Sequence, residues 1–185
     1  KGIKLEQVRE NVKAAQAAGI FTATSMIVPL PFDTPETLAA SLSFVTDLRP
    51  DSVPLQFPGV FPGSRWSLNP ERYNLEVDDL DRMFDEGMGY RIKLLFPPQF
   101  WDPLPYKVNG MSFREFTAVT LRFGHDLEQA GILTNFSHTL AALAKSAEMP
   151  PRQLRDLAML WCVTGDAEAM GDMVTRANRN MLQRA

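Results

Sequence analysis

Two short segments of this sequence end in residue types that suit a ligand-binding rim. The first is an apolar, β-branched run that reaches Ile27 and stops at Pro29, Leu30 and Pro31, because prolines cannot donate hydrogen bonds to a sheet. The second run ends at Gln56. Ligands of α/β folds usually lie beyond the carboxyl ends of parallel strands. The sequence therefore predicts a site at Ile27, Pro29, Leu30 and Gln56; the alternative is that these residues only pack the core and its loops.

The other residues that could do chemistry have ordinary structural interpretations. His125 and His138 fall on different predicted helices without the i, i+4 spacing of a helical zinc site, so we expect solvent exposure or local hydrogen bonds. Cys162 lies in an apolar helical turn, and we expect it to be a buried structural thiol. The acidic run 76–81 places negative charge at a helix N-terminus, where it is favourable. The sequence predicts no metal site.

Composition narrows the class of protein. The chain has 185 residues, of which 45% are hydrophobic and 22% charged, which is enough for one sizeable core or two small ones. Its net charge of -3 argues against nucleic acid as a partner, and no apolar run is long enough for a membrane span. A single cysteine excludes an internal disulfide and fits a reducing, cytoplasmic compartment. Because the first residue is not methionine, we expect a piece of a longer protein.

The first half of the chain is predicted to be α/β. Helical periodicity over 4–18 is followed by a strand at 20–28, a helix at 35–48 and a strand at 52–57 that Pro54 weakens. Strand, helix and strand in this order form a βαβ unit with parallel strands. We also expect a short acidic helix at 77–86 and a strand at 90–96.

The second half is predicted to be helical. A capping box at Ser112–Glu115 opens an apolar stripe that continues to Ala130, and further helices are expected at 137–147, 151–163 and 166–182. The fold class is thus α/β followed by all-α. We expect three parts: an α/β domain at 1–96, a stiff connector rich in proline and aromatic residues at 97–111, and a helical domain at 112–185.

Five short motifs occur in a fixed order over about residues 1–66. They are Lys1-Gly2-Ile3 before a helix, Ala18-Gly19-Ile20-Phe21-Thr22, the run from Met26 to Thr37, Leu48-Arg49-Pro50-Asp51, and Phe61-Pro62-Gly63-Ser64. Their order and spacing resemble the later part of the radical S-adenosylmethionine (SAM) barrel, in the group with an upstream cobalamin-binding domain. The sequence departs from the family at the loop, where Pro29 and Phe32 replace glycines and Asp33 replaces glutamate.

The resemblance implies a partial β/α barrel that ends in a C-terminal helical bundle. Ile27 and Leu30 would then face an adenine, with Gln56 as the nearest uncharged polar group, while proline at position 29 removes a backbone donor from that contact. The family holds its [4Fe–4S] cluster with three cysteines, which Cys162 alone cannot supply. The cluster, SAM binding and any cobalamin would belong to the parent protein, with the upstream part of the same polypeptide as a partner.

Two functions from different classes follow. The first is the C-terminal part of a radical SAM iron–sulfur enzyme, an oxidoreductase or methyltransferase on an organic small-molecule or peptide substrate, which is not active as this chain alone. The second is a non-catalytic helical module, from about 112 to 182, that binds a peptide or protein partner on an α/β scaffold.

Overall fold

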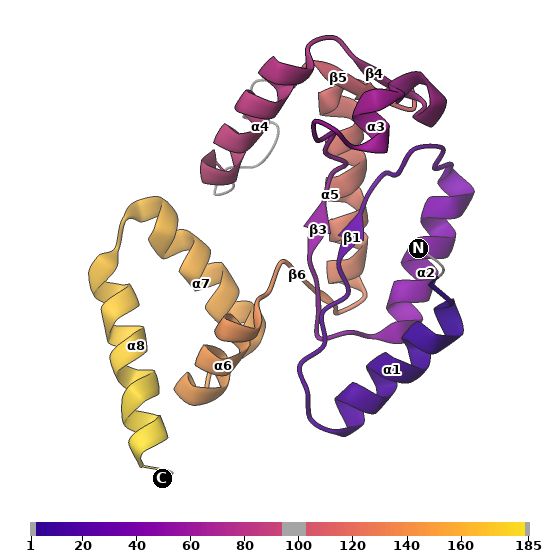
Figure 1. Cartoon of the computed structure of the whole chain (residues 1–185). Helices are drawn as coiled ribbons and strands as arrows, with labels where there is room; N and C mark the ends of the chain where they lie inside the picture. Colours follow the sequence, from indigo (N-terminus) through magenta and orange to yellow (C-terminus); the bar gives the residue numbers. More distant parts are fainter. Residues whose placement is uncertain (1–2, 94–102, 184–185) are drawn as a thin grey trace. The chain divides into compact units, whose positions relative to one another are not determined.

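The computed structural model describes residues 3–93 and 103–183, and the side chains of 87–93 are not described. The chain divides into two compact units, Lys1–Thr134 and Asn135–Ala185. The first unit contains helices and short strands, and the second is helical (Figure 1). The expected domain boundary at 97–111 thus differs from the division between compact units, and the aromatic residues 100 and 101 of that connector lie outside the described residues.

The first unit is built around short parallel strands. Its elements in chain order are α1 (Leu5–Ala17), β1 (Met26–Ile27), α2 (Pro35–Leu48), β2 (Ser52–Val53), β3 (Leu55–Gln56), α3 (Arg65–Leu68), η1 (Pro70–Tyr73), β4 (Leu75–Val77), α4 (Leu80–Lys93), β5 (Tyr106–Val108), α5 (Phe113–Gln129) and β6 (Leu133–Thr134). β1 pairs in parallel with β3, and β2 pairs in parallel with β6. Ser52 also bridges Ala23 in parallel, so the β2–β3 segment is central, with β1 and β6 on either side.

The expected βαβ unit is present, although its strands are shorter than the sequence indicates. Pro54 separates β2 from β3 because it lacks an N–H, yet its carbonyl still accepts from the Met26 N–H at 2.9 Å. α2 covers the predicted 35–48, and Thr34 caps it by accepting from the Thr37 N–H at 3.3 Å. The described strands form no barrel; the structure supports only the coarser class, α/β with a helical part.

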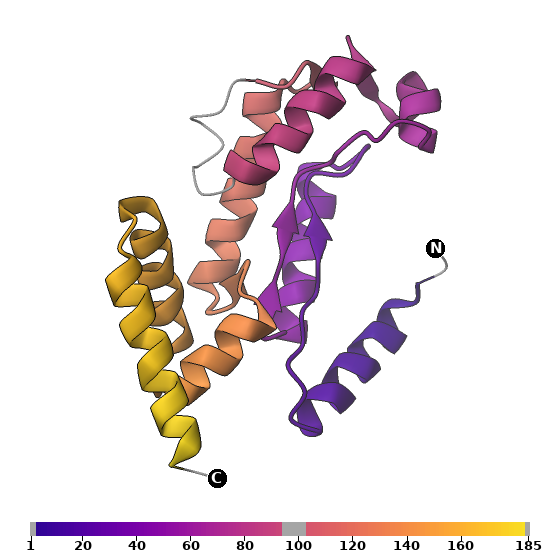
Figure 2. The same cartoon turned by 60° about the vertical axis from the view of Figure 1, so that its left-hand side comes forward.

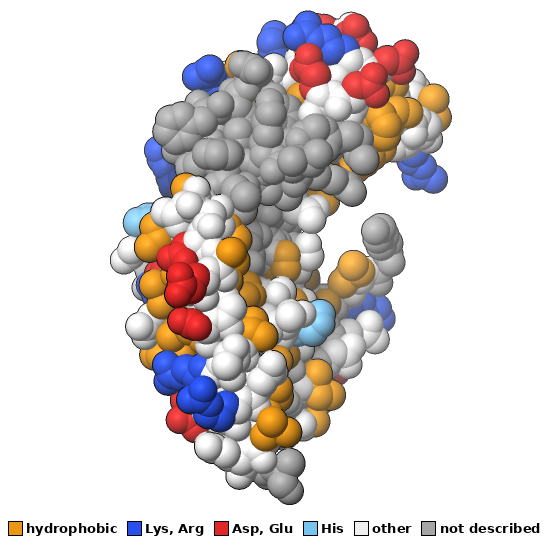
Figure 3. Space-filling view, turned by 90° about the vertical axis from the view of Figure 1, so that its left-hand side faces the viewer, with side chains coloured by type: hydrophobic (Ala, Val, Ile, Leu, Met, Phe, Trp, Pro, Cys, Tyr) orange, Lys and Arg blue, Asp and Glu red, His pale blue; other side chains and the backbone are white. Residues whose placement is uncertain are grey.

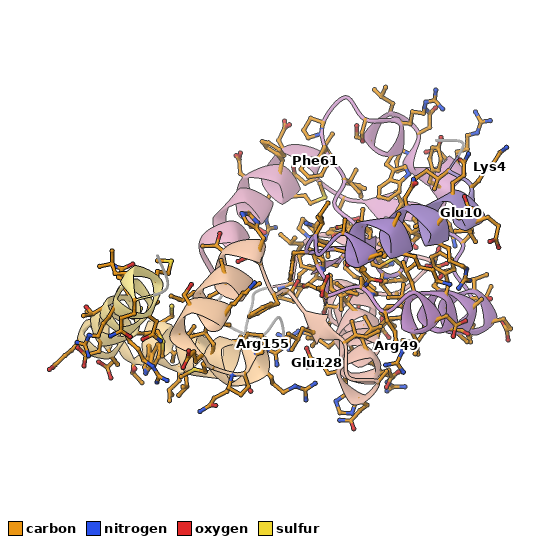
Figure 4. All side chains as sticks on the ribbon, turned by 90° about the horizontal axis from the view of Figure 1, so that it is seen from below. Lys4, Glu10, Arg49, Phe61, Glu128 and Arg155 are labelled. Atoms are coloured by element: carbon orange, nitrogen blue, oxygen red, sulfur yellow. The ribbon has the colours of Figure 1, made fainter. Side chains whose placement is uncertain are left out.

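Two helices pack on one face of these strands. Met26 and Val28 of the first strand segment, with Val53 and Leu55 of the second, form one apolar cluster with side chains of α2 and α5. In Figure 1, α5 runs behind β1 and β3. Gly124 permits the close approach, because a Cβ there would lie 2.9 Å from the Leu55 Cδ1. α5 and β6 are held together by Thr134, whose N–H donates to Glu128 Oε1 at 2.7 Å (Figure 4).

α1 lies at the margin of the unit (Figure 2), and none of its residues is buried. The Gln16 amide donates to the Arg49 carbonyl at 2.7 Å and so connects α1 to the end of α2. Asp51 anchors the start of the first strand segment, because its Oδ2 accepts from the Thr22 N–H at 2.7 Å and from the Thr22 hydroxyl at 2.8 Å. The amino ends of the strands are therefore fixed by polar contacts rather than by burial of α1.

A short hairpin, in which the turn Asn109-Gly110 joins β5 to Met111, lies between β3 and α5 in the chain and contributes to a second, aromatic cluster. β5 also pairs antiparallel with β4, from which α4 separates it along the chain, and the two turn residues have φ of 54° and 74°. Positive φ at both positions is the pattern of a type I′ turn, for which Asn-Gly is the preferred sequence. Tyr106 of β5 packs against Phe113 and Phe116 at the start of α5, with ring centroids 6.2 and 5.1 Å apart. α5 thus takes part in both apolar clusters of the unit.

Three sequence predictions need correction in these regions. Tyr90–Lys93 is the end of α4, not part of a strand; residues 94–96 lie outside the described residues. The region after 112 is not all helical, because it contains β6, a two-residue strand too short for a period-two pattern to reveal. Its first helix, α5, belongs with the strands of the first unit.

The second unit contains α6 (His138–Ala147), α7 (Pro151–Thr164) and α8 (Ala167–Leu182), close to the predicted ranges. α6 packs against both α7 and α8. The buried side chains of this unit are those of Phe136, Leu154 and Met173, together with three alanines, Ala144, Ala147 and Ala177. Hydrophobic side chains, orange in Figure 3, remain on its surface. None of the described helices of the chain is both long and apolar enough to cross a membrane.

Candidate functional site at the carboxyl ends of the parallel strands

The predicted site residues Ile27 and Gln56 are neighbours. They are register partners in the parallel pair of β1 and β3, so their side chains leave the same face of the sheet side by side. The adjoining partners Met26 and Leu55 leave the opposite face and pack with α2 and α5. Ile27 is 39% exposed and Gln56 is exposed. Ile27 and Gln56 therefore lie on the face opposite the helices, at the carboxyl ends of two parallel strands.

The other two predicted residues, Pro29 and Leu30, lie in the loop that follows β1 but differ in exposure. Leu30 is 42% exposed, whereas Pro29 is fully buried and follows a cis Val28–Pro29 peptide. Below the loop, the Thr120 hydroxyl of α5 donates to the Val28 carbonyl. The structure thus places Ile27, Leu30 and Gln56 on the surface and Pro29 beneath it.

The loop Leu30–Phe32 is held from two directions. From its own chain, Asp33 Oδ2 accepts from the Leu30 N–H at 2.6 Å, and the Asp33 N–H donates to the Leu30 carbonyl at 3.0 Å. From the inserted hairpin, Asn109 Oδ1 accepts from the Phe32 N–H at 2.7 Å, while Asn109 Nδ2 donates to the Leu30 carbonyl at 2.9 Å. A charged carboxylate and an amide therefore fix the same short stretch of backbone.

Asn109 is itself well anchored. Its N–H donates to the Asn74 carbonyl at 2.9 Å, and its Oδ1 also accepts from Asn74 Nδ2 at 3.2 Å. The dipeptide Asn109-Gly110 is a strong turn signal, so the sequence could have indicated the hairpin. The contact of Asn109 with a loop far earlier in the chain was missed, because a turn signal carries no information about tertiary partners.

Phe32 has an unusual backbone conformation at this loop. Its φ is 67°, in the left-handed region that costs a residue with a Cβ about 1–2 kcal/mol. Among the described non-glycine residues with positive φ, the others are asparagines or helix C-caps, Arg49 and Glu148. Phe32 belongs to neither class. Glycine would adopt this conformation without that cost.

The loop after β3 forms the other part of the surface at the carboxyl ends of the strands. Pro58 is buried, and its carbonyl accepts a hydrogen bond from the Tyr106 hydroxyl. Burial raises the pKa of Tyr106 well above its usual range, so this hydroxyl stays protonated and remains a donor. Farther along the loop, Phe61 is 51% exposed (Figure 4). The hairpin therefore supports both loops, through Asn109 on one and Tyr106 on the other.

The arrangement provides a binding surface rather than a set of reacting groups. Its exposed side chains are apolar, and the carboxamide of Gln56 can both donate and accept hydrogen bonds. Chemically, Ile27 and Leu30 can make apolar contacts, and Gln56 can exchange hydrogen bonds with a polar edge. The described residues contain no group of three or more His, Cys, Asp or Glu side chains that could hold a metal ion.

The remaining candidates lie outside this site. His125 and His138 are exposed, and His138 Nε2 lies 3.5 Å from the Thr139 hydroxyl, as a local role predicts. The prediction for the acidic run is confirmed only in part. Asp79 Oδ1 accepts from the Arg82 N–H at 2.9 Å at the start of α4, whereas Glu76 lies in β4 and pairs with Lys107 at 2.7 Å. The prediction for Cys162 is wrong: this cysteine is exposed, because the apolar turn around it faces outward.

Comparisons with family models, with curated proteins and with solved structures found no match to this chain.

Proposed function

We propose that this chain is the later part of a radical SAM barrel, which an upstream part of the same polypeptide completes. The parent protein would be a cytoplasmic iron–sulfur oxidoreductase or methyltransferase acting on an organic substrate. This chain would shape the rim against which the adenosyl group of SAM and the substrate lie. The [4Fe–4S] cluster, which supplies the electron for SAM cleavage, would be held by upstream cysteines. Any cobalamin would be bound by an upstream domain.

One observation carries the proposal. Ile27 and Gln56, the residues that the resemblance assigns to the nucleoside, are register partners on the sheet face opposite the helices. The strand order supports it too. β1, the β2–β3 segment and β6 are parallel and sequential, and the connecting helices α2 and α5 share one apolar cluster, as in a singly wound β/α barrel. Within the described residues β1 pairs on one side only, which leaves an edge for a preceding strand.

The first experiment adds the upstream part of the polypeptide that the proposal requires. The chain is expressed joined to the residues encoded immediately before Lys1, and the product is reconstituted anaerobically with iron and sulfide. We expect a brown protein that cleaves SAM to 5′-deoxyadenosine and methionine on reduction. A preceding sequence without three clustered cysteines, or a reconstituted protein that does not cleave SAM, would overturn the proposal.

The second experiment tests the assigned surface. Ile27→Asp should weaken SAM binding at least about tenfold, because it places a charge and its hydration shell against the adenine. Ser25→Asp is the matched control, since Ser25 is also exposed and precedes β1, two residues and so about 7 Å before Ile27 in an extended chain. Equal loss in both variants would show that the effect is not specific to the predicted contact.

A second candidate function rests on the helical unit. α7 exposes Met159, Leu160 and Val163, each more than half exposed. A shallow depression of about 580 Å³ on this helix is lined by Pro150, Arg152, Gln153, Asp156, Leu157 and Leu160. We propose as the alternative that this surface binds an amphipathic peptide or protein helix. Peptides selected for binding to the chain should lose affinity for Leu160→Gln; peptides that bind both forms equally would contradict it.

A further inference from the structure

The hydrogen-bond ladder between the segments of β1 and β3 advances by two residues at each step and then stops. Its steps join the N–H groups of Thr24, Met26 and Val28 to the carbonyls of Ser52, Pro54 and Gln56, at 3.0, 2.9 and 2.9 Å respectively. Because the bonds of a parallel ladder are evenly spaced, the next step would join the Leu30 N–H to the Pro58 carbonyl. These two described groups do not bond to each other.

Side chains occupy both groups instead. Asp33 Oδ2 accepts from the Leu30 N–H at 2.6 Å. The hydroxyl of Tyr106, in β5, donates to the Pro58 carbonyl. Each group that would make the next ladder bond therefore has another partner, and the two partners come from different parts of the chain.

The carbonyl of Val28 has a replacement partner as well. The Ser52 N–H donates to the Thr22 carbonyl at 3.1 Å, and the same offset assigns the Val28 carbonyl to a donor at residue 58. Proline has no N–H, and the Thr120 hydroxyl of α5 donates to the Val28 carbonyl instead. Side chains from the β1 loop, β5 and α5 thus satisfy the end of the ladder.

The two strands lead into loops that are held by different partners. After β3, the Phe57 ring packs edge-on against Phe113, with ring centroids 5.5 Å apart. After β1, Asp33 lies next to the cap of α2. In Figure 1 the chain leaves β1 toward α2 and leaves β3 toward α3. The loops therefore separate directly after the register partners Ile27 and Gln56, where the proposed site lies.

Packing alone does not require the hydroxyl of Tyr106. The ring is buried among phenylalanines, with centroids 6.2 Å from Phe113 and 5.1 Å from Phe116, and a phenylalanine would fill the same place. What the hydroxyl adds is the hydrogen bond to the Pro58 carbonyl. The hydroxyl therefore acts on the loop after β3 rather than on the aromatic cluster.

We infer that Tyr106 is a positioning residue of the site, which together with Asp33 keeps the loops after β1 and β3 apart. Without these two side chains, the Leu30 N–H and the Pro58 carbonyl would pair, and the loops would close to the spacing of neighbouring strands, about 4.8 Å. The effect on SAM rests on the proposed function. The separation of the loops is a property of this chain alone.

Scalar couplings across hydrogen bonds, measured by NMR on the chain, test the separation. In Asp33→Ala the Leu30 N–H is released while Tyr106 still holds the Pro58 carbonyl, so we expect no coupling between the Leu30 nitrogen and the Pro58 carbonyl carbon. Addition of Tyr106→Phe to this variant should produce that coupling. A coupling already present in Asp33→Ala, or none in the folded double variant, would overturn the inference.

Tyr106→Phe alone tests the positioning role in the extended protein, and it keeps the ring that the core needs. We expect the KM for SAM to rise at least about fivefold and kcat to stay within about twofold, because a freed loop weakens binding without changing the cleavage step. Thr117→Val is the matched control, since it removes a buried hydroxyl of α5 that donates to the Phe113 carbonyl of its own helix at 2.7 Å.

Both variants should lower the thermal unfolding midpoint, but only Tyr106→Phe should raise the KM. An unchanged KM in Tyr106→Phe, or an equal rise in Thr117→Val, would show that Tyr106 has a structural role only. If the extended protein does not cleave SAM while the couplings behave as expected, the radical SAM assignment falls and the separation of the loops stands. If it cleaves SAM and the couplings do not behave as expected, the assignment stands and the inference falls.

Discussion

The apolar stripes of α5 and α7 look alike in the sequence, but the two helices bury them to different extents. α5 buries Phe113, Phe116, Phe123 and Leu127, whereas α7 buries only Leu154. α5 has partners along its whole length, because its first turns join the aromatic cluster of the hairpin and its last turns join the cluster of the strands. α7 packs against the two other helices of its small unit. A stripe therefore predicts a helix, but the number of surrounding elements decides how much of it is buried.

Truncation of Phe116 is expected to have the largest effect on stability of the changes considered in these two helices. This side chain is fully buried, with ring centroids 5.1 Å from Tyr106 and 5.3 Å from Phe113. Phe116→Ala should lower the free energy of unfolding by about 3–5 kcal/mol, since it removes a large apolar surface and leaves a cavity. Chemical denaturation measures the effect. Leu121→Ala, on the exposed side of the same helix, should cost less than about 1 kcal/mol, and similar losses in both variants would show that the aromatic cluster is not a core.

Leu154 gives the corresponding test in the helical unit. It is the one buried residue of α7, and three of the five other buried residues described in this unit are alanines. Leu154→Ala should cost about 2–3 kcal/mol, at the lower end for such a truncation, because a small core has fewer contacts to lose. Hydrogen exchange of peptides from α6, α7 and α8 should rise together. Unchanged exchange in α6 and α8 would show that α7 does not support them.

The helices and the site differed in how far the sequence could predict them. Helix ends follow from local signals, such as Thr34 before Pro35 or Ser112 before Glu115, and these positions match. The neighbouring positions of Ile27 and Gln56 follow from parallel pairing at the expected strand ends. The anchoring of Phe32 by Asn109 could not be predicted, because it depends on a long-range contact between two loops. Nor could the exposure of Cys162, which depends on the size of the unit around it.

α5 and α7 also differ at their first turns, and this difference predicts different responses to pH. Glu115 Oε2 accepts from both the N–H and the hydroxyl of Ser112 at 2.7 Å, and these bonds lower the pKa of Glu115, whereas α7 begins at Pro151 without a side-chain cap. A lowered pKa in the folded state gives stability that is present above the unfolded pKa of about 4.3 and is lost as the pH falls through the folded pKa.

Glu115→Gln should therefore lower the unfolding midpoint at about pH 7, and the difference from the parent chain should disappear at about pH 2, where both side chains are neutral. Thermal unfolding at several pH values measures this. Arg114→Gln, at the neighbouring exposed position of the same turn, removes a positive charge instead and should not lower the midpoint at about pH 7, because a cation is unfavourable at a helix N-terminus. A difference that persists at low pH would mean that the ionised carboxylate is not the source of the effect.

The smallest effect is expected on the outer side of α7 and sharpens the contrast with α5. Leu160 is 54% exposed, so Leu160→Gln should change the free energy of unfolding by less than about 0.5 kcal/mol. Leu157→Gln is the matched comparison on the same helix, since Leu157 is half-buried and should lose more. A loss of more than about 1 kcal/mol at Leu160 would mean that another surface covers this side of α7 in solution. A near-zero loss leaves the side chain available to a partner, because a surface that folding does not need can be occupied without cost to the fold.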